Sequence, residues 1–440
     1  MEYREFLQAA AEVKPSLRQA KWFDTEFYAF VHFTVNTYTD LEWGLGNEPE
    51  SIFNPTELDC GQWVETVKSA GAKALILTAK HHDGFCLWPS AYTEHCVKNS
   101  PWKNGLGDVV KEASEACRRG GIGFGVYLSP WDRNSKYYGT PEYNDYYCNQ
   151  LTELLTNYGE LFAVWFDGAC GEGPNGRKQV YDFPRYISLI RKYQPNAVIF
   201  NDAGPDVRWC GNEAGTGRAE EWAVVPSELC FRSEIQTGAG PEEGSLAGLY
   251  NSDPAIGTLS QIRYTKGLVF AGAEFDMSIR PGWFYHAKEE PHSLERLMKT
   301  YITSVGGNGC LNLNVPPMPN GRFDERDVAR MKEFGDALKA AFGTPLEAAV
   351  ETKALSETQC EITLTLPEKK HISYVVLEED LSVGQRVEMF TVKNADGGQI
   401  FRGTTIGHKR ICPVNTDTDK VTVQILSARA KPAFRAVKLF

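Results

Sequence analysis

Short apolar runs alternate with longer amphipathic segments between about residue 72 and residue 201. A short apolar run is typical of a buried strand, and apolar positions spaced three and four apart are typical of a helix packed on one face. The consecutive glycines Gly120 and Gly121 mark the end of the first amphipathic segment. The pattern predicts strands at 74–78, 123–128, 161–166 and 197–200, separated by helices at 108–119, 142–158 and 181–193.

Strands that alternate with helices pair in parallel through right-handed crossovers. Repeated units of this kind predict an α/β fold, a (β/α)8-like barrel, which we assign to residues 1–343. From about Leu346 onward, apolar and polar residues alternate with a period of two, which is typical of antiparallel strands with one buried face. We therefore expect a C-terminal antiparallel β-sandwich over residues 344–440, with strands at 361–366, 372–377, 386–392 and 421–425.

Each of the four predicted strands is followed by a polar or aromatic cluster. Active sites of (β/α) barrels lie at the C-terminal ends of the strands, where such clusters would meet. A structural turn could explain any one cluster, but four clusters in register favour a shared site. The clusters are Lys80-His-His-Asp-Gly84, Ser129-Pro-Trp-Asp-Arg133, Asp167-Gly-Ala169 and Asn201-Asp202.

Composition and charge narrow the classes of partner. The 440 residues include 46 Lys and Arg against 57 Asp and Glu, a net charge of −11, and there is no Lys/Arg-rich run. Such a chain lacks the basic footprint of a protein that binds nucleic acid or an anionic membrane, and a neutral substrate fits its charge. The aromatic content of 12% gently favours a sugar ligand, because amphipathic rings suit such sites.

The chain is expected to be soluble, because no stretch approaches about 18 uninterrupted apolar residues. Its eleven cysteines are scattered singly, which favours reduced, buried thiols. Residues 1–14 carry acids and lack the apolar core of a signal peptide. A periplasmic or secreted protein whose signal has been removed would look the same as a cytoplasmic one, so the compartment stays open, as does the oligomeric state.

Two carboxyl groups are candidates for nucleophilic and acid–base chemistry. Asp167 ends a strongly apolar strand, where a buried carboxylate needs a purpose, and the glycine after it permits close approach of a ligand. Glu213 lies in the glycine-flanked segment 209–215, just beyond the next predicted strand. From position alone, a strand-end cap remains an alternative role for Asp167. The acids that compete with Glu213 are Glu42, Glu220, Glu221, Glu234 and Glu274.

Imidazole and indole side chains accompany these carboxyls. His81 and His82 point in different directions on an extended chain, which is poor geometry for a shared metal. We favour hydrogen bonding to sugar hydroxyls for this pair and for His32, with a structural role as the alternative. Glu42 and Trp43 offer a hydroxyl acceptor and a stacking face. We expect no metal, because the eight histidines do not form a ligand set, and no cofactor, since the sequence holds no nucleotide-binding glycine loop. The lack of a GxSxG elbow disfavours a serine hydrolase.

At these residues the sequence resembles glycoside hydrolase family 29, the α-L-fucosidases. The similarity extends from about Gln19 to Asn314 and is carried by segments that are together very specific for that family. They are Glu26-Phe-Tyr-Ala-Phe-Val-His-Phe33, Glu42-Trp-Gly-Leu-Gly46, Leu77-Thr-Ala-Lys-His-His-Asp-Gly-Phe85, Tyr127-Leu-Ser-Pro-Trp-Asp-Arg133, Trp165-Phe-Asp-Gly-Ala169, Trp209-Cys-Gly-Asn-Glu-Ala-Gly215 and Ser278-Ile-Arg-Pro-Gly-Trp-Phe-Tyr-His286.

The resemblance implies a barrel followed by a β-sandwich, and a retaining exo-α-L-fucosidase activity. Carried over by motif, the nucleophile is Asp167. The segments 209–215 and 278–286 resemble the subgroup that removes α-1,3/1,4-linked fucose from Lewis-type glycans, in which the acid/base is Glu213. The residues implied to bind fucose are His32, Glu42, Trp43, His81, His82, Tyr127, Trp165 and Trp283.

Two alternatives to this function stay open. A broad-specificity α-L-fucosidase would also act on aryl fucosides and α-1,2 linkages. A non-catalytic fucose-binding relative would keep the His and Trp residues but lose a catalytic carboxylate. The expected partner is a fucosylated oligosaccharide or glycoconjugate, with no nucleic acid and no membrane.

Overall fold

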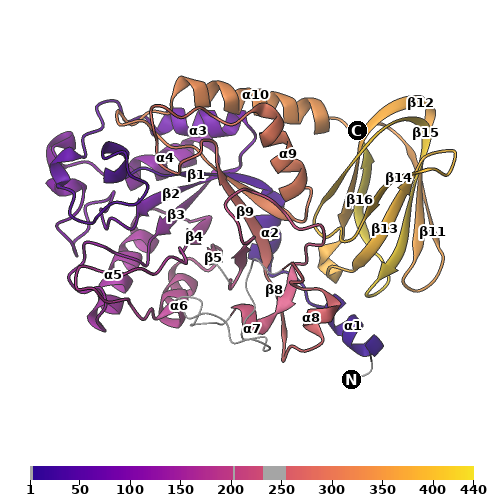
Figure 1. The fold of residues 1–440 in the computed structure, drawn as a ribbon, viewed down its shortest axis with the longest axis horizontal. Helices are drawn as coiled ribbons and strands as arrows, with labels where there is room; N and C mark the ends of the chain where they lie inside the picture. Colours follow the sequence, from indigo (N-terminus) through magenta and orange to yellow (C-terminus); the bar gives the residue numbers. More distant parts are fainter. Residues whose placement is uncertain (1–2, 202–203, 231–253) are drawn as a thin grey trace.

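The N-terminal part of the chain forms a closed barrel of eight parallel strands, on the left in Figure 1. The computed structural model describes residues 3–201, 204–230 and 254–440, so Asp202 and Glu234 lie outside the described residues. The strands follow the order β1-β10-β9-β6-β5-β4-β3-β2 around the barrel. They are β1 (Phe27–Val31), β2 (Ala74–Lys80), β3 (Gly123–Leu128), β4 (Ala163–Trp165), β5 (Val198–Phe200), β6 (Val207–Trp209), β9 (Gly272–Ser278) and β10 (Gly309–Asn314).

Helices surround the barrel and provide most of its crossovers (Figure 1). The link between β5 and β6 spans only residues 201–206, too short for a crossover helix, so the barrel is irregular there. The short strands β7 (Val224–Pro226) and β8 (Leu268–Phe270) form a separate antiparallel pair. The helices are α1 (Tyr3–Ala11), α2 (Leu17–Thr25), α3 (Cys60–Ser69), α4 (Val109–Gly120), α5 (Glu142–Asn157), α6 (Phe183–Tyr193), α7 (Ser227–Cys230), α8 (Leu259–Ile262), α9 (Leu294–Ser304) and α10 (Glu325–Phe342). Short 3-10 turns cover Val35–Tyr38, Glu50–Ile52, Val97–Asn99, Trp102–Gly105 and Leu381–Val383.

The barrel strands are buried on both faces, and several of them, such as β1, therefore appear in the sequence as continuous apolar runs. Every residue of β1 and β2 is buried. Alternate residues of these strands belong to two different cores: Phe30 and Ile76 to one, and Ala29 and Leu75 to the other. The first core contains residues of many barrel strands, and the second joins the strands to the surrounding helices.

The predicted barrel elements are confirmed, with shifts at their ends. Asp108 caps α4 by accepting the N–H of Lys111 at 2.9 Å, and Gly121, at φ +69°, ends it as the double glycine predicts. The strand predicted at 161–166 is shorter, because only Ala163–Trp165 forms β4. The N–H of Leu161 instead donates to a glutamine side chain at the end of α6, at 3.0 Å.

The C-terminal part is an antiparallel sheet with the order β11-β12-β15-β13-β14, and β16 also pairs with β12. The predicted strands 361–366 and 372–377 prove to be parts of one long strand, so predicting a break between them was wrong. The exposed charged residues 368–371 mimic a turn, but pairing with β15 resumes at Lys370 after a register shift. The strands are β11 (Ala349–Ala354), β12 (Cys360–Glu379), β13 (Val387–Lys393), β14 (Gln399–Gly403), β15 (Arg410–Ala428) and β16 (Phe434–Leu439).

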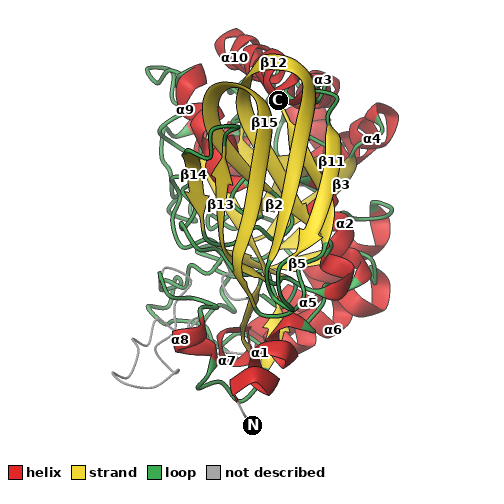
Figure 2. Ribbon diagram, turned by 90° about the vertical axis from the view of Figure 1, so that its right-hand side faces the viewer, coloured by secondary structure: helices red, strands yellow, loops and turns green. Residues whose placement is uncertain are grey.

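The two long strands β12 and β15 give this sheet its two-layered form. They run side by side through its whole length in Figure 2. Near one end they pair with β11 and β13, and near the other end β12 pairs with β16. Side chains from both ends, such as Ile362 and Leu377, share one hydrophobic core, as expected for a sandwich.

The sheet lies beside the barrel, and α10 leads into it (Figure 1). The proposed boundary at residues 343 and 344 falls between Phe342, where α10 ends, and Ala349, where β11 begins. Ten cysteines of the described part carry free thiols, and nine of those residues are buried. No helix of the described residues is both long enough and apolar enough to cross a membrane.

Candidate active site

A cavity of about 140 Å³ lies at the C-terminal ends of the barrel strands. A larger hollow, of about 480 Å³, lies at the opposite ends of the strands and contains none of the predicted site residues. The smaller cavity contains both predicted catalytic carboxyls and seven of the eight predicted sugar-binding residues. It is lined by Phe30, His32, Glu42, Trp43, His81, His82, Trp165, Asp167, Ala169, Glu213, Asp276 and Trp283.

Two hydrogen bonds hold Asp167 at the end of β4. Its Oδ1 accepts the N–H of Ala169 at 2.8 Å, and its Oδ2 accepts the hydroxyl of Tyr127 at 2.9 Å. The Nε2 atom of His82 lies 3.7 Å from the same Oδ2. Burial and the neighbouring carboxylate raise the pKa of Tyr127 well above its ordinary value, so the phenol remains a donor. Tyr127, the eighth predicted sugar-binding residue, therefore supports Asp167 directly.

Glu213 lies in an exposed segment that follows β6. The indole Nε1–H of Trp283 donates to its Oε2 at 3.3 Å. Asn212 shapes the segment, because its Oδ1 accepts the N–H groups of Ala214 and Thr216, each at 3.1 Å. This segment, which is not part of a barrel strand, thus places the carboxyl of Glu213 at the cavity that contains Asp167.

The competing acids of the described chain are engaged elsewhere. Glu221 is buried in ion pairs with two arginines, and Glu220 accepts an indole N–H at 2.8 Å. Glu274 is buried in the barrel, and burial raises its pKa to about 7. Glu274 accepts hydrogen bonds from three side chains: Tyr28, Trp165 and Asn312. None of these three acids lines the cavity, whereas Glu42 and Glu213 do.

His32 and His82 are imidazoles with defined tautomers. The Nδ1 of His32 lies 2.8 Å from the amide oxygen of Asn314, which can only accept. The hydroxyl of Ser129 donates to the carbonyl of Trp131, so its oxygen accepts from Nδ1 of His82 at 2.7 Å. Each neutral ring therefore carries its proton on Nδ1 and keeps Nε2 as an acceptor. Burial lowers the pKa of His32 to about 4 and also lowers that of His82, so both rings are neutral at neutral pH.

Aromatic rings stack one behind another along the barrel. His81 stacks on Tyr127, with 5.6 Å between ring centroids, and Tyr127 stacks on Trp165 at 5.2 Å. Trp165 stacks on Phe200 at 4.1 Å. Trp43 is 55% exposed at the cavity. These rings provide the apolar faces on which the C–H surface of a sugar can pack.

Glu42 joins the segment after β1 to the segment after β9. Its two oxygens accept the N–H groups of Trp283 at 2.8 Å and Phe284 at 3.2 Å. Its Oε1 lies 2.7 Å from Nε2 of His286, whose Nδ1 lies 2.5 Å from Asp40. Burial opposes the charged form of His286, but the two carboxylates outweigh it and raise its pKa. His286, placed between two acids, thus ties this side of the cavity together.

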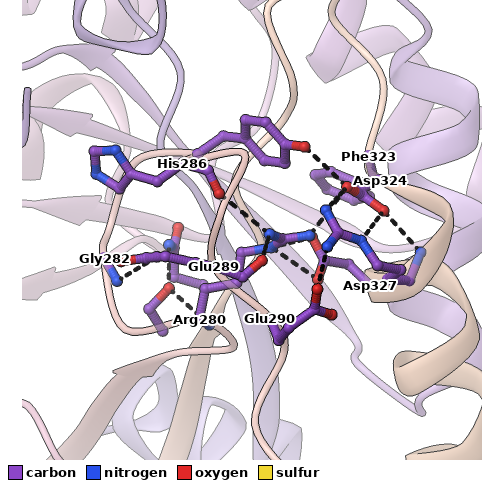
Figure 3. Close-up of polar contacts among 12 residues, drawn as sticks. Arg280, Gly282, His286, Glu289, Glu290, Phe323, Asp324 and Asp327 are labelled. Carbon is purple, nitrogen blue, oxygen red and sulfur yellow. Dashed lines mark hydrogen bonds and ion pairs between the residues drawn. The ribbon is translucent and has the colours of Figure 1, made fainter. Parts of the chain in front are cut away.

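Arg280 anchors the segment after β9 (Figure 3). Its Nε donates to both oxygens of Asp327, at 3.0 and 2.8 Å, and its Nη2 lies 3.2 Å from Asp324. Its Nη1 donates to the carbonyls of His286 and Glu289. Because the arginine is buried, these bonds fix the turn on which Trp283 and His286 are presented.

Two residues of this site were missed in the sequence. Asp276 lines the cavity, and a signal was present, because polar residues occupy every second position of β9 at Glu274, Asp276 and Ser278. That alternation marks the inner face of a barrel strand. His286 belongs to a family-like segment, but only the folded chain places it between Asp40 and Glu42.

The fold and the site define a class of protein. Paired carboxyls among imidazoles and indoles at the C-terminal mouth of a parallel barrel are the construction of a barrel glycoside hydrolase. No group of three or more His, Cys, Asp or Glu side chains in residues 3–201, 204–230 and 254–440 is placed to hold a metal ion.

Comparison with known proteins identifies the family. The family model described as alpha-L-fucosidase matches residues 7–222 and 265–341. Alpha-L-fucosidase 1 of Arabidopsis thaliana is 41% identical over 431 residues, covering 90% of this chain and 81% of the relative. The chain belongs to the α-L-fucosidase family and is a glycoside hydrolase with α-L-fucosidase activity.

Solved structures agree with this family. A Bacteroides ovatus structure described as an α-L-fucosidase is 44% identical, with a TM-score of 0.92, and covers 99% of this chain and 75% of that one. A Ruminococcus gnavus fucosidase of glycoside hydrolase family 29, solved in complex with fucose, is 30% identical with a TM-score of 0.84. That match covers 98% of this chain and 95% of the relative.

Proposed function

We propose that the enzyme is a retaining exo-α-L-fucosidase that releases terminal α-1,3/1,4-linked fucose from Lewis-type oligosaccharides and glycoconjugates. Asp167 is the nucleophile and Glu213 is the acid/base. The observation that carries this proposal is that both carboxyls line one small cavity, together with three histidines and three tryptophans.

The size of the cavity supports an exo mode of action. Its volume of about 140 Å³ is well below the roughly 300–1,000 Å³ of sites that enclose drug-sized ligands. A single terminal sugar is therefore the part of the substrate that is buried, and the rest of the glycan stays outside. The Ruminococcus gnavus relative in complex with fucose supports fucose as that sugar.

Retention of configuration requires two displacements at the anomeric carbon. Asp167 attacks that carbon while Glu213 gives its proton to the leaving oxygen, and Glu213 then accepts a proton from the water that releases fucose. The bonds from Ala169 and Tyr127 hold the carboxylate of Asp167 in one orientation. Because the carboxylate is already oriented, less of the activation free energy is spent on reaching the attack geometry.

Sugar recognition uses the acceptors and rings of the cavity. The free Nε2 atoms of His32 and His82 accept from sugar hydroxyls, and Glu42 provides a charged acceptor. The apolar face of the sugar packs on the rings. The remaining proposed contacts are Trp43, His81, Trp165 and Trp283, with Tyr127 behind Asp167.

The choice of linkage rests on two segments. Residues 209–215 and 278–286 resemble the branch-selective subgroup, and the structure joins them through the hydrogen bond from Trp283 to Glu213. A rival function is a broad-specificity fucosidase that acts on aryl fucosides and α-1,2 linkages. Comparing the rates on a Lewis trisaccharide, an α-1,2-fucosylated disaccharide and an aryl fucoside separates the two, and equal rates would exclude branch selectivity.

Variants of the two carboxyls test the mechanism. Asp167→Ala is expected to abolish turnover while fucose still binds. With the unchanged enzyme, nuclear magnetic resonance of the first product should show the α-anomer of fucose. Glu213→Ala should slow substrates with poor leaving groups far more than activated aryl fucosides, because only the former need a proton. If Glu213→Ala lost the same share of its rate on both substrates, Glu213 would not be the acid. A β-anomer as the first product would contradict the retaining mechanism.

A further inference from the structure

Asp276 is a carboxyl of the cavity that the proposed mechanism does not use. It belongs to β9, is 4% exposed and lines the same cavity as Asp167 and Glu213. Its Oδ1 accepts the indole Nε1–H of Trp209 at 2.7 Å. No other side chain of the described residues forms a hydrogen bond with this carboxyl, so Oδ2 is left for a ligand in the cavity.

The surroundings of Asp276 disfavour a carboxylate ion. The charged groups that act on it are acidic: Glu274 on the same strand and Glu213 on the segment after β6. Hydrogen bonds from the Trp209 indole and from the backbone N–H of Asp276 itself act in the opposite direction, but burial outweighs them. On the β6 side lies Cys210, whose pKa burial raises, so its thiol is neutral. No basic side chain of the described chain forms an ion pair with Asp276. Burial raises the pKa of Asp276 well above its usual range, and the two glutamates add to the rise.

Acceptors outnumber free donors among the side chains that line the cavity, where His81 and the indole of Trp43 can still donate. His32 and His82 present unprotonated nitrogens, and the carboxylates of the site accept as well. The indole N–H of Trp165 is bonded to Glu274, and that of Trp283 is bonded to Glu213. Each sugar hydroxyl both donates and accepts, so a cavity that buries a sugar also has to offer donors.

We propose that Asp276 contacts the bound sugar as a neutral carboxylic acid, with Oδ2–H donating a hydrogen bond to a hydroxyl of the buried fucose. This inference rests on the proposed function, since it needs the sugar in the cavity that holds Asp167. A carboxyl kept neutral by burial is a stronger donor than a hydroxyl, and the indole of Trp209 bonds to Oδ1 and not to Oδ2.

The variants Asp276→Asn and Asp276→Ala test the proposed hydrogen bond through the inhibition constant for L-fucose. Asp276→Asn keeps the shape, accepts from Trp209 through its amide oxygen and donates through its N–H, so it should keep the inhibition constant for L-fucose within about threefold. Asp276→Ala removes the donor and should raise the inhibition constant for L-fucose about tenfold. Inhibition by L-fucose measures only the binding of the monosaccharide. The activity of the unchanged enzyme on an aryl fucoside tests the proposed function separately.

Trp209→Phe is the matched control, because it removes the bond to Oδ1 and leaves the carboxyl in place. It should keep fucose binding within about threefold. Should Asp276→Ala not fold, the double variant Trp209→Phe, Asp276→Val removes both partners and takes its place. The proposal is overturned if asparagine weakens binding as much as alanine, if alanine leaves binding unchanged, or if Trp209→Phe alone reproduces the loss.

Discussion

At the scale of single residues, the hydrogen bond behind an imidazole decides which of its atoms meets the ligand. His82 is fixed by Ser129, whose own proton is committed to the carbonyl of Trp131. The chain of two bonds therefore determines that Nε2 is an acceptor. Sequence spacing showed two adjacent histidines, but it could not show which nitrogen faces a sugar.

Ser129→Ala should raise KM for an aryl fucoside about three- to tenfold with a smaller change in kcat, because His82 loses the partner that fixes its tautomer. Steady-state kinetics measures both constants. Ser114→Ala is the matched control, since Ser114 is also buried and also donates to a backbone carbonyl, at 2.9 Å, but lies on α4. An unchanged KM in Ser129→Ala would contradict this role.

At the scale of elements, the segment between β9 and α9 is ordered by a buried charge. Arg280 reaches back to Asp327 on α10, and its Nη1 holds two carbonyls of the turn that presents Trp283 (Figure 3). Burial raises the pKa of Asp327 to about 6 in spite of the arginine. This carboxylate therefore depends on Arg280 to remain charged in the folded protein.

Arg280→Met should lower the free energy of unfolding by about 3–5 kcal/mol, because Asp327 is left buried without a partner. Urea unfolding at neutral pH measures the loss. The double variant Arg280→Met, Asp327→Asn removes the stranded charge and should recover part of the stability. A double variant no more stable than Arg280→Met would show that the lost carbonyl contacts, rather than the charge, are responsible.

At the scale of the whole molecule, the C-terminal sheet is fastened to the barrel near the starts of β1 and β10. Lys409 lies 2.5 Å from the carboxylate of Glu26, just before β1, and His408 lies 3.5 Å from it. The N–H of His408 also donates to Asn308 at 2.7 Å. These contacts are at the opposite end of the barrel strands from the cavity, so the sheet supports the barrel without forming the site.

Glu26→Gln should lower the free energy of unfolding at neutral pH by on the order of 2–3 kcal/mol. Burial raises the pKa of Glu26, but His408 and Lys409 outweigh it and lower it to about 2 from an ordinary 4.5. A lowered pKa gives stability that is present above about pH 4.5 and disappears as the pH falls toward 2, so the two proteins should converge in acid. Denaturation from pH 7 to pH 3 measures this. The exposed Glu65→Gln is the control and should change little.

Much of the barrel was predictable because its strands are buried on both faces. Residues 123–128 were predicted as a strand and form β3 without a shift, and the glycine pair at the end of α4 acts as expected. The prediction of a break in β12 was wrong because the charged residues 368–371 are exposed to solvent within a continuous strand and do not form a turn. Asp276 was overlooked although the polar alternation of β9 marks its inner face, because only the closed barrel shows that this face reaches the cavity.

The sequence by itself determined the alternation of strands and helices, the family and the candidate carboxyls, because burial periodicity and local motifs are properties of neighbouring residues. Only the tertiary structure decided which acids meet at the cavity, which nitrogens of His32 and His82 are free and why the pKa of Asp276 is raised. Those properties depend on burial and on partners hundreds of residues apart, such as Asn314 for His32. Such distances in the chain are bridged by the closure of the barrel alone.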